Sequence, residues 1–272
     1  MLAVDQREAL RAMMAVGRPG EVSDADLTRF KVSAAKALSP HASAILIDKQ
    51  FGWDAVVGAS VVDPSCAMIA AVDAFTPSKH EFVAESVIDE ELDFAELKRQ
   101  GAKALKLLVL WRPDTDPEER VAMVDDFVAR CRTHDLVSVV EPVSRGRRDK
   151  AASDLEAGIL SAARELGDRG ADIYKSEVPT HGTGTDAEID AKCRELTDAI
   201  NGQWVVLSSG VDAERFPEVV DVACRAGASG FLAGRAVWAS VVTHDDWDSE
   251  LERVSIPRLE RLAAIVDDAV TR

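Results

Sequence analysis

Two lysines lie inside runs of apolar residues, where a charged side chain is unusual. Lys106 interrupts ALKLLVLW (104–111) and Lys175 interrupts ADIYKSEVP (171–179). Desolvation and a neighbouring cation both disfavour the charged form of a buried lysine. A neutral amine can attack a ketone to give a carbinolamine and then an iminium ion. The pattern therefore predicts a Schiff-base lysine and a lowered pKa for a lysine that faces inward.

Carboxylates accompany the two lysines. Glu141 lies in LVSVVEP (136–142), and Glu177 shares a strand face with Lys175 through the two-residue period of a strand. An iminium ion accepts the electrons left by a breaking C–C bond, and carboxylates then carry protons to and from the hydroxyl groups. The same residues also fit a structural interpretation, in which Lys106–Glu141 and Lys175–Glu177 are simple ion pairs.

Two glycine-containing turns near the end of the chain predict an anion-binding site. They are LSSGVD (207–212) and LAGRAVW (232–238). Loops at these strand ends of α/β barrels often bind phosphate through backbone N–H groups, and an arginine adds a charge-assisted contact. The expected ligands are Ser208, Ser209, Gly210, Gly234 and Arg235.

Eight short apolar runs, most followed by a segment with helical spacing, indicate repeated strand–helix units. Near-continuous apolar runs are typical of strands buried on both faces of a parallel sheet. The predicted strands cover 1–5, 42–48, 67–73, 104–111, 136–142, 171–179, 204–210 and 230–234. Predicted helices cover Glu118–His134, Asp149–Gly167, Asp186–Asn201, Phe216–Ala226 and Ile256–Val270.

This order predicts an α/β fold with a single (β/α)8 TIM barrel as one domain over residues 1–272. An open doubly wound sheet is the alternative, but no G-x-G-x-x-G turn follows the first strand. Chemistry in such barrels sits at the carboxyl ends of the strands. Asp5, Gln6 and Asp48 stand there, so we expect them to contact the substrate.

The composition excludes some classes of function. A net charge of −16 and a pI of about 4.8 argue against nucleic acid as a partner. Four widely spaced cysteines predict reduced thiols rather than disulfides or zinc ligands. No 18-residue apolar run predicts a membrane span, and acidic residues interrupt the N-terminal apolar stretch, so a cytoplasmic protein without a signal peptide is expected.

Two features leave alternatives open. Arg145, Arg147 and Arg148 crowd the segment after a predicted strand, where they would bind a second anionic group or form a solvated basic loop. Asp48 and Asp73 follow neighbouring strands and could instead hold a divalent ion for metal-assisted enolisation.

The whole chain resembles the class I aldolases that include tagatose 1,6-bisphosphate aldolase and sulfofructosephosphate aldolase. The resemblance rests on AVDQRE (3–8), LSPHASAILID (38–48), GAKALKLLVLWR (101–112), EPV (141–143), ADIYKSEVP, LSSGVD and GASGFLAGRAVW (227–238). Within that family, ALKLLVLWR, SGFLAGRAVW and SCAMIAA (65–71) are more similar to sulfofructosephosphate aldolase.

The resemblance implies retro-aldol cleavage of 6-deoxy-6-sulfofructose 1-phosphate to dihydroxyacetone phosphate and 3-sulfolactaldehyde. Lys175 matches the Schiff-base lysine, Glu141 the proton-transfer carboxylate and Lys106 the second interior lysine. It also implies a homo-oligomer with a sugar phosphate or sulfonate as its partner, and no cofactor or metal. Tagatose or fructose 1,6-bisphosphate is the alternative substrate, and a non-catalytic sensor that keeps the barrel is the alternative from another class.

Overall fold

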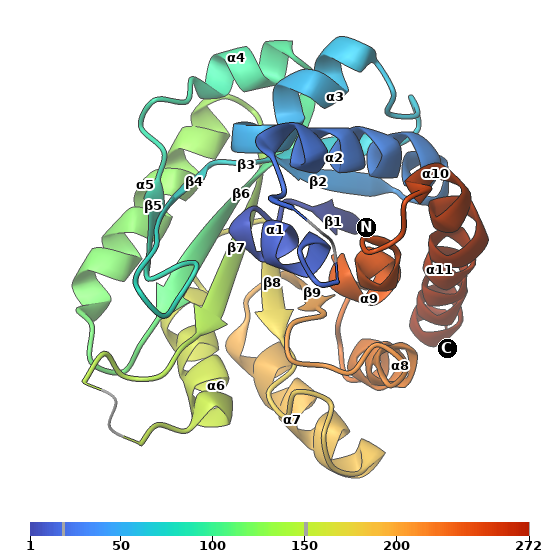
Figure 1. Ribbon diagram of the computed structural model, residues 1–272. Coiled ribbons are helices and arrows are strands. Elements are labelled where there is room, and N and C mark those ends of the chain that lie inside the picture. The colour runs from blue at the N-terminus through green and yellow to red at the C-terminus, as the bar shows by residue number, and fades with distance from the viewer. Residues whose placement is uncertain (18–19, 150–151, 272) are drawn as a thin grey trace.

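The protein, described here by a computed structural model, folds as a curled parallel β-sheet covered by helices (Figure 1). The structure describes residues 1–17, 20–149 and 152–271. Seven strands pair in the order β1-β2-β3-β6-β7-β8-β9. Their bounds are β1 Leu2–Val4, β2 Ala44–Asp48, β3 Ala67–Ala71, β6 Ala102–Trp111, β7 Val137–Ser144, β8 Ile173–Glu177 and β9 Gln203–Leu207.

Helices connect the strands and cover the outer face of the sheet (Figure 1). The α-helices are α1 Glu8–Met14, α2 Asp24–Leu38, α3 Asp54–Ala59, α4 Phe94–Arg99, α5 Pro117–Thr133, α6 Leu155–Leu166, α7 Asp186–Ala199, α8 Phe216–Arg225, α9 Arg235–Trp238, α10 Trp247–Glu250 and α11 Ile256–Val270. Short 3-10 turns occupy Ser39–His41 and Ala239–Val241, and π-helical turns occupy Lys49–Trp53 and Leu251–Ser255.

Capping residues explain where the predicted helices begin. The Asp116 side chain accepts a hydrogen bond from the Glu118 amide at 2.8 Å, and Pro117 takes the first helical position of α5, as predicted. The helix predicted from Asp149 begins later, at Leu155, because Asp154 caps it by accepting from the Ala157 amide. Positions 150 and 151 of that prediction lie outside the described residues.

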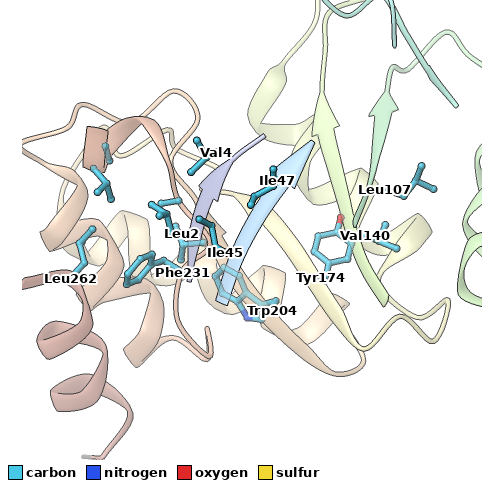
Figure 2. Close-up of a cluster of buried hydrophobic side chains, with 14 of the residues drawn as sticks. Leu2, Val4, Ile45, Ile47, Leu107, Val140, Tyr174, Trp204, Phe231 and Leu262 are labelled. Carbon is cyan, nitrogen blue, oxygen red and sulfur yellow. The ribbon is translucent and has the colours of Figure 1, made fainter. Parts of the chain in front are cut away.

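Side-chain alternation along the strands separates two apolar cores. Outward residues such as Leu2, Ile45 and Trp204 pack against the helices in the larger cluster (Figure 2). Inward residues form a second cluster with members from every strand of the sheet except β8, and Leu232 lies beside them. This second cluster comprises Ala3, Ala44, Leu46, Ile69, Ala71, Ala104, Val139, Val205 and Leu232, with Ile173 packed against it. An apolar layer therefore fills the concave side of the curled sheet.

The eighth predicted strand, 230–234, is not formed as a strand. Phe231 makes an isolated parallel bridge to Val206 of β9, and Ala233 makes one to Leu2 of β1. Backbone hydrogen bonds join this segment to both neighbours, for example Leu232 N to Val206 O at 2.9 Å and Ala3 N to Ala233 O at 2.9 Å. Gly230 has a φ of +145°, and the pairing of this segment is limited to one isolated bridge on each side.

The predicted strand 67–73 also differs from the structure. It ends at Ala71, and Asp73–Thr76 forms a separate strand, β4, in an antiparallel hairpin with β5, Glu85–Ile88. The four cysteines are free and buried, as predicted. Among the described helices, none is long and apolar enough to cross a membrane.

Candidate active site

A layer of charged side chains lies directly above the inner apolar layer, toward the carboxyl ends of the strands. Lys106 follows Ala104 on the inner face of β6, and Glu141 follows Val139 on β7. Lys175 follows Ile173 on β8 in the same way. Lys175 Nζ lies 3.0 Å from Glu141 Oε2, and Lys106 Nζ lies 3.3 Å from the same oxygen. The three residues predicted to be catalytic are thus brought together, and all are buried.

Lys106 is saturated with carboxylate partners. Its Nζ lies 2.8 Å from Asp5 Oδ2 and 2.8 Å from Asp73 Oδ2, in addition to Glu141. Burial alone would lower the pKa of Lys106, but the three carboxylates outweigh burial and raise it above its ordinary value. The predicted lowering of the pKa is therefore wrong for Lys106, which remains a cation.

Asp5 and Asp73 are held by further charges. Burial opposes ionisation of Asp5, but Lys106 and Lys175 outweigh it and hold the pKa of Asp5 below its ordinary range. Asp73 accepts from Arg7 Nη2 at 2.7 Å, and the Arg7 guanidinium stacks 4.2 Å from the centre of the Phe75 ring. Asp5 and Arg7, which follow β1, are therefore part of the charged cluster.

Glu177 does not pair with Lys175, although the two share a strand face. Its Oε2 accepts from the Ser144 amide at 2.9 Å, and its Oε1 lies 3.9 Å from Arg145 Nη1. Burial raises the pKa of Glu177, against the opposing effects of Arg145 and Ser144. The structural interpretation as a Lys175–Glu177 ion pair is therefore not supported, and Lys175 pairs with Glu141 instead.

Asp48, predicted to contact substrate, is engaged by a residue that the sequence analysis missed. Lys31 of α2 is fully buried, and its Nζ lies 2.5 Å from Asp48 Oδ1. The other Asp48 oxygen accepts from the Phe51 amide at 2.8 Å. The signal for Lys31 was its helical spacing: it lies four residues from Leu27 and four from Ala35, on the buried face of the helix.

The predicted anion-binding residues lie on two separate loops. Ser208 is buried after β9, and Gly210 has a φ of +77° with the His181 ring packed against it, where a Cβ would lie 2.5 Å from Cδ2. At Gly234 a Cβ would lie 2.2 Å from the Ala3 carbonyl oxygen. Gly234 thus permits close approach to β1. Arg235 is exposed, and its side chain has no ion-pair partner among the described residues.

The other residues predicted to bind substrate or an anion are Gln6, Ser209 and the arginines after β7. The Gln6 Oε1 atom is buried without a hydrogen-bond partner in the described structure, beside Asp5. Ser209 is half-buried at the start of the loop after β9. Arg147 and Arg148 line a surface cavity of about 550 Å³ beside the β4–β5 hairpin, away from the two interior lysines. Arg147 pairs there with Asp149 at 2.7 Å.

The alternative hypothesis of a divalent metal site relied on Asp48 and Asp73, and both carboxylates form ion pairs with basic side chains. Asp48 is paired with Lys31, and Asp73 with Arg7 and Lys106. Within the described ranges, no group of three or more histidine, cysteine, aspartate or glutamate side chains is arranged so that it could hold a metal ion. The arrangement instead provides a buried amine, Lys175, in contact with one carboxylate that a second, permanently charged lysine also contacts.

Comparisons with known proteins agree with this chemistry. The family described as DeoC/LacD family aldolase matches residues 1–240. Tagatose 1,6-diphosphate aldolase 1 of Enterococcus faecalis is 30% identical over 271 residues, covering 89% of this chain and 80% of the relative. The corresponding protein of Streptococcus pyogenes serotype M1 is 29% identical over 270 residues, with 89% and 81% covered.

Solved structures show the same fold at low sequence identity. An archaeal fructose-1,6-bisphosphate aldolase, with its catalytic lysine bound to a carbinolamine intermediate, aligns with a TM-score of 0.66 at 15% identity, over 97% of this chain and 93% of that one. A fructose-bisphosphate aldolase from Slackia heliotrinireducens aligns with a TM-score of 0.68 at 16% identity, over 98% and 85%. The chain belongs to the DeoC/LacD family of aldolases.

Proposed function

We propose that Lys175 forms the Schiff base with a ketose 1-phosphate and that Glu141 carries the protons of the reaction. The observation that supports this assignment is the 3.0 Å contact between Lys175 Nζ and Glu141 Oε2 inside a buried cluster. A carboxylate at that distance can take a proton from the ammonium group and so prepare the amine for attack. Lys106 contacts the same carboxylate oxygen at 3.3 Å and so holds Glu141 in place beside Lys175.

The proposed reaction is a retro-aldol cleavage. The Lys175 amine adds to the C2 carbonyl, and loss of water gives the iminium ion. Glu141 gives the proton it took from Lys175 to the hydroxyl that leaves as water, and can then remove the proton of the C4 hydroxyl. The C3–C4 bond breaks, its electron pair moves toward the iminium nitrogen to form an enamine, and the C4 fragment leaves as an aldehyde. Protonation at C3 and hydrolysis of the resulting iminium release dihydroxyacetone phosphate and return the free lysine.

We place the phosphate of C1 at the loops after β9 and after residues 230–234. Ser208, Ser209 and Gly210 offer backbone and hydroxyl donors there, and Arg235 offers a guanidinium without a carboxylate partner among the described residues. Gly234 contributes by letting its loop approach β1. We also propose that residues 230–234 serve as the eighth strand of a barrel, because they hydrogen-bond to both β9 and β1.

We propose 6-deoxy-6-sulfofructose 1-phosphate as the substrate. Among the described arginines that follow strand ends, Arg7, Arg112, Arg145, Arg147 and Arg148 all face a carboxylate, which leaves Arg235 as the one without. One unengaged cation suits one phosphate dianion and a distal group of lower charge, such as a sulfonate, with Gln6 near it. The alternative is tagatose or fructose 1,6-bisphosphate, favoured by the names of the relatives.

A steady-state comparison decides between these substrates. The protein would be supplied with each of the three sugars, and release of dihydroxyacetone phosphate measured, with and without EDTA. We expect the largest kcat/KM for the sulfosugar and no effect of EDTA. A larger kcat/KM for either bisphosphate would contradict the sulfosugar assignment, and loss of activity in EDTA would restore the metal alternative.

The remaining expectations belong to the same proposal. We propose that the chain acts as one catalytic domain, as a homo-oligomer in the cytoplasm, on a small-molecule sugar. Retention of Glu141 beside both interior lysines favours an enzyme over a sensor that merely keeps the fold.

A further inference from the structure

The side chain of Lys31 extends from α2 toward the charged layer, and its aliphatic stem packs against Gly52. The residue lies on the buried face of α2 and is 0% exposed. A Cβ at Gly52 would lie 2.9 Å from Lys31 Cδ and 2.5 Å from Ile47 Cγ2. Glycine at position 52 therefore leaves room for the aliphatic stem of Lys31 beside the end of β2.

The Lys31 ammonium group is enclosed by acceptors of the protein itself. Nζ donates to the carbonyl oxygens of Val4 and Gln6, both at 2.7 Å, and contacts Asp48 Oδ1 at 2.5 Å. Two of the three ammonium donors thus bind backbone carbonyls, and the Asp48 carboxylate lies against the ammonium group as its counter-charge. Lys31 therefore has no donor left for a substrate, and its effect on the reaction must be indirect.

The two carbonyls that Lys31 binds flank Asp5 in the chain. Asp5 Oδ2 contacts Lys106 at 2.8 Å, Lys106 contacts Glu141 Oε2 at 3.3 Å, and that oxygen contacts Lys175 at 3.0 Å. β1 is only three residues long and ends at Val4, so beyond it the backbone has no ladder partner to fix it. Lys31, on α2, instead fixes this part of the backbone through its hydrogen bonds to the Val4 and Gln6 carbonyls.

We propose that Lys31 is a positioning residue for the aldol reaction. By binding both carbonyls that flank Asp5, it holds the Asp5 carboxylate against Lys106 and so orients Glu141 toward Lys175. This inference rests on the proposed Schiff-base function. Small displacements of a catalytic group reduce turnover strongly even when the protein remains folded.

The charge balance of the cluster determines which variants can test this role. Cations and carboxylates are equal in number, so removing Lys31 alone would leave Asp48 as an uncompensated buried charge. The double variant Lys31→Met/Asp48→Asn removes one charge of each sign but still leaves the Val4 and Gln6 carbonyls without their donor. The balanced set comprises Arg7, Lys31, Lys106 and Lys175 against Asp5, Asp48, Asp73 and Glu141.

The test measures melting temperature, kcat and KM for the double variant, for Lys31→Arg, and for the control Lys36→Met on the exposed face of the same helix. We expect the double variant to be folded, with kcat reduced about 100-fold and KM nearly unchanged. Lys31→Arg keeps the charge, but its planar fork cannot make the same three bonds. We expect it to lose about tenfold in kcat at an unchanged KM, and Lys36→Met to match the wild type.

Wild-type kcat in a folded double variant would overturn the proposal, as would a loss of activity that only follows the fraction folded. If the double variant does not fold, Lys31→Arg decides, and wild-type kcat in that variant would overturn the proposal. Reductive trapping of the wild type on dihydroxyacetone phosphate separates the two hypotheses. Absence of a Lys175 adduct in the wild type contradicts the proposed function itself, whereas a normal adduct with unaffected Lys31 variants contradicts only the positioning role.

Discussion

The two sides of the charged layer are built differently. On the side of β1, β2 and β6, the ammonium groups of Lys31 and Lys106 are surrounded by acceptors from several strands. On the side of β7 to β9, Lys175 forms an ion pair with Glu141 alone among the described residues, and Arg235 has no ion-pair partner among them. The difference indicates that the first side fixes geometry, while the second has unused capacity for a substrate.

Removing Lys175 should have the largest effect on activity. Lys175→Met deletes the proposed nucleophile, so kcat for cleavage should fall on the order of 10⁴-fold or more. The fold should survive, since Glu141 keeps its contact with Lys106. The measurement is release of dihydroxyacetone phosphate, with circular dichroism to check folding. A variant that retains more than a tenth of wild-type kcat would contradict the assignment.

Removing Lys106 should damage stability more than removing Lys175 does. Lys106→Met leaves the carboxylates of Asp5 and Asp73 without their shared lysine, and breaking a buried ion pair costs about 3–5 kcal/mol. Urea unfolding of the two methionine variants measures the difference directly. Equal free energies of unfolding would show that the two sides of the layer are not distinct.

Arg235 tests whether the side of β7 to β9 binds the substrate phosphate. Arg235→Ala should raise KM by about 10- to 100-fold, which corresponds to the loss of a hydrogen bond to a charged group, with a smaller change in kcat. Stability should be unchanged, because the side chain is exposed. Arg261→Ala, on α11, is a matched control for removing an arginine. An unchanged KM for Arg235→Ala would remove this arginine from the phosphate site.

The smallest expected effect concerns pH. Asp5 has a folded-state pKa below its ordinary value of about 3.9, so its contribution to stability is present above about pH 4 and is lost as the pH falls toward the folded-state pKa. Asp5→Asn should therefore destabilise the protein more at pH 7 than at pH 2.5. Urea unfolding at both pH values tests this, and an equal effect at the two would contradict the ionised state of Asp5.

The side chains whose placement was predicted correctly are those whose signal is local to a strand. Lys106, Glu141 and Lys175 each interrupt an apolar run, and strand alternation then places them on one inner face. The order of strands and the main helices followed from the same periodicity. The proximity of these three side chains could therefore be predicted without knowing the conformation of any loop.

The features that were missed depend on tertiary contacts. The raised pKa of Lys106 comes from carboxylates on three other segments, which the sequence does not show to converge. Lys31 lies on a helix, where a buried lysine looks like a surface residue unless the helical spacing is followed. Residues 230–234 were predicted as a strand because the segment is largely apolar, whereas the structure pairs it only through two isolated bridges.

The most direct test of the central claim is reductive trapping. The wild-type protein would be incubated with dihydroxyacetone phosphate, reduced with borohydride, and analysed by intact and peptide mass spectrometry. We predict a single adduct on Lys175, since its amine has the least engaged environment of the buried lysines described here. An adduct on Lys106 or Lys31, or no adduct on any lysine of the folded protein, would contradict the assignment.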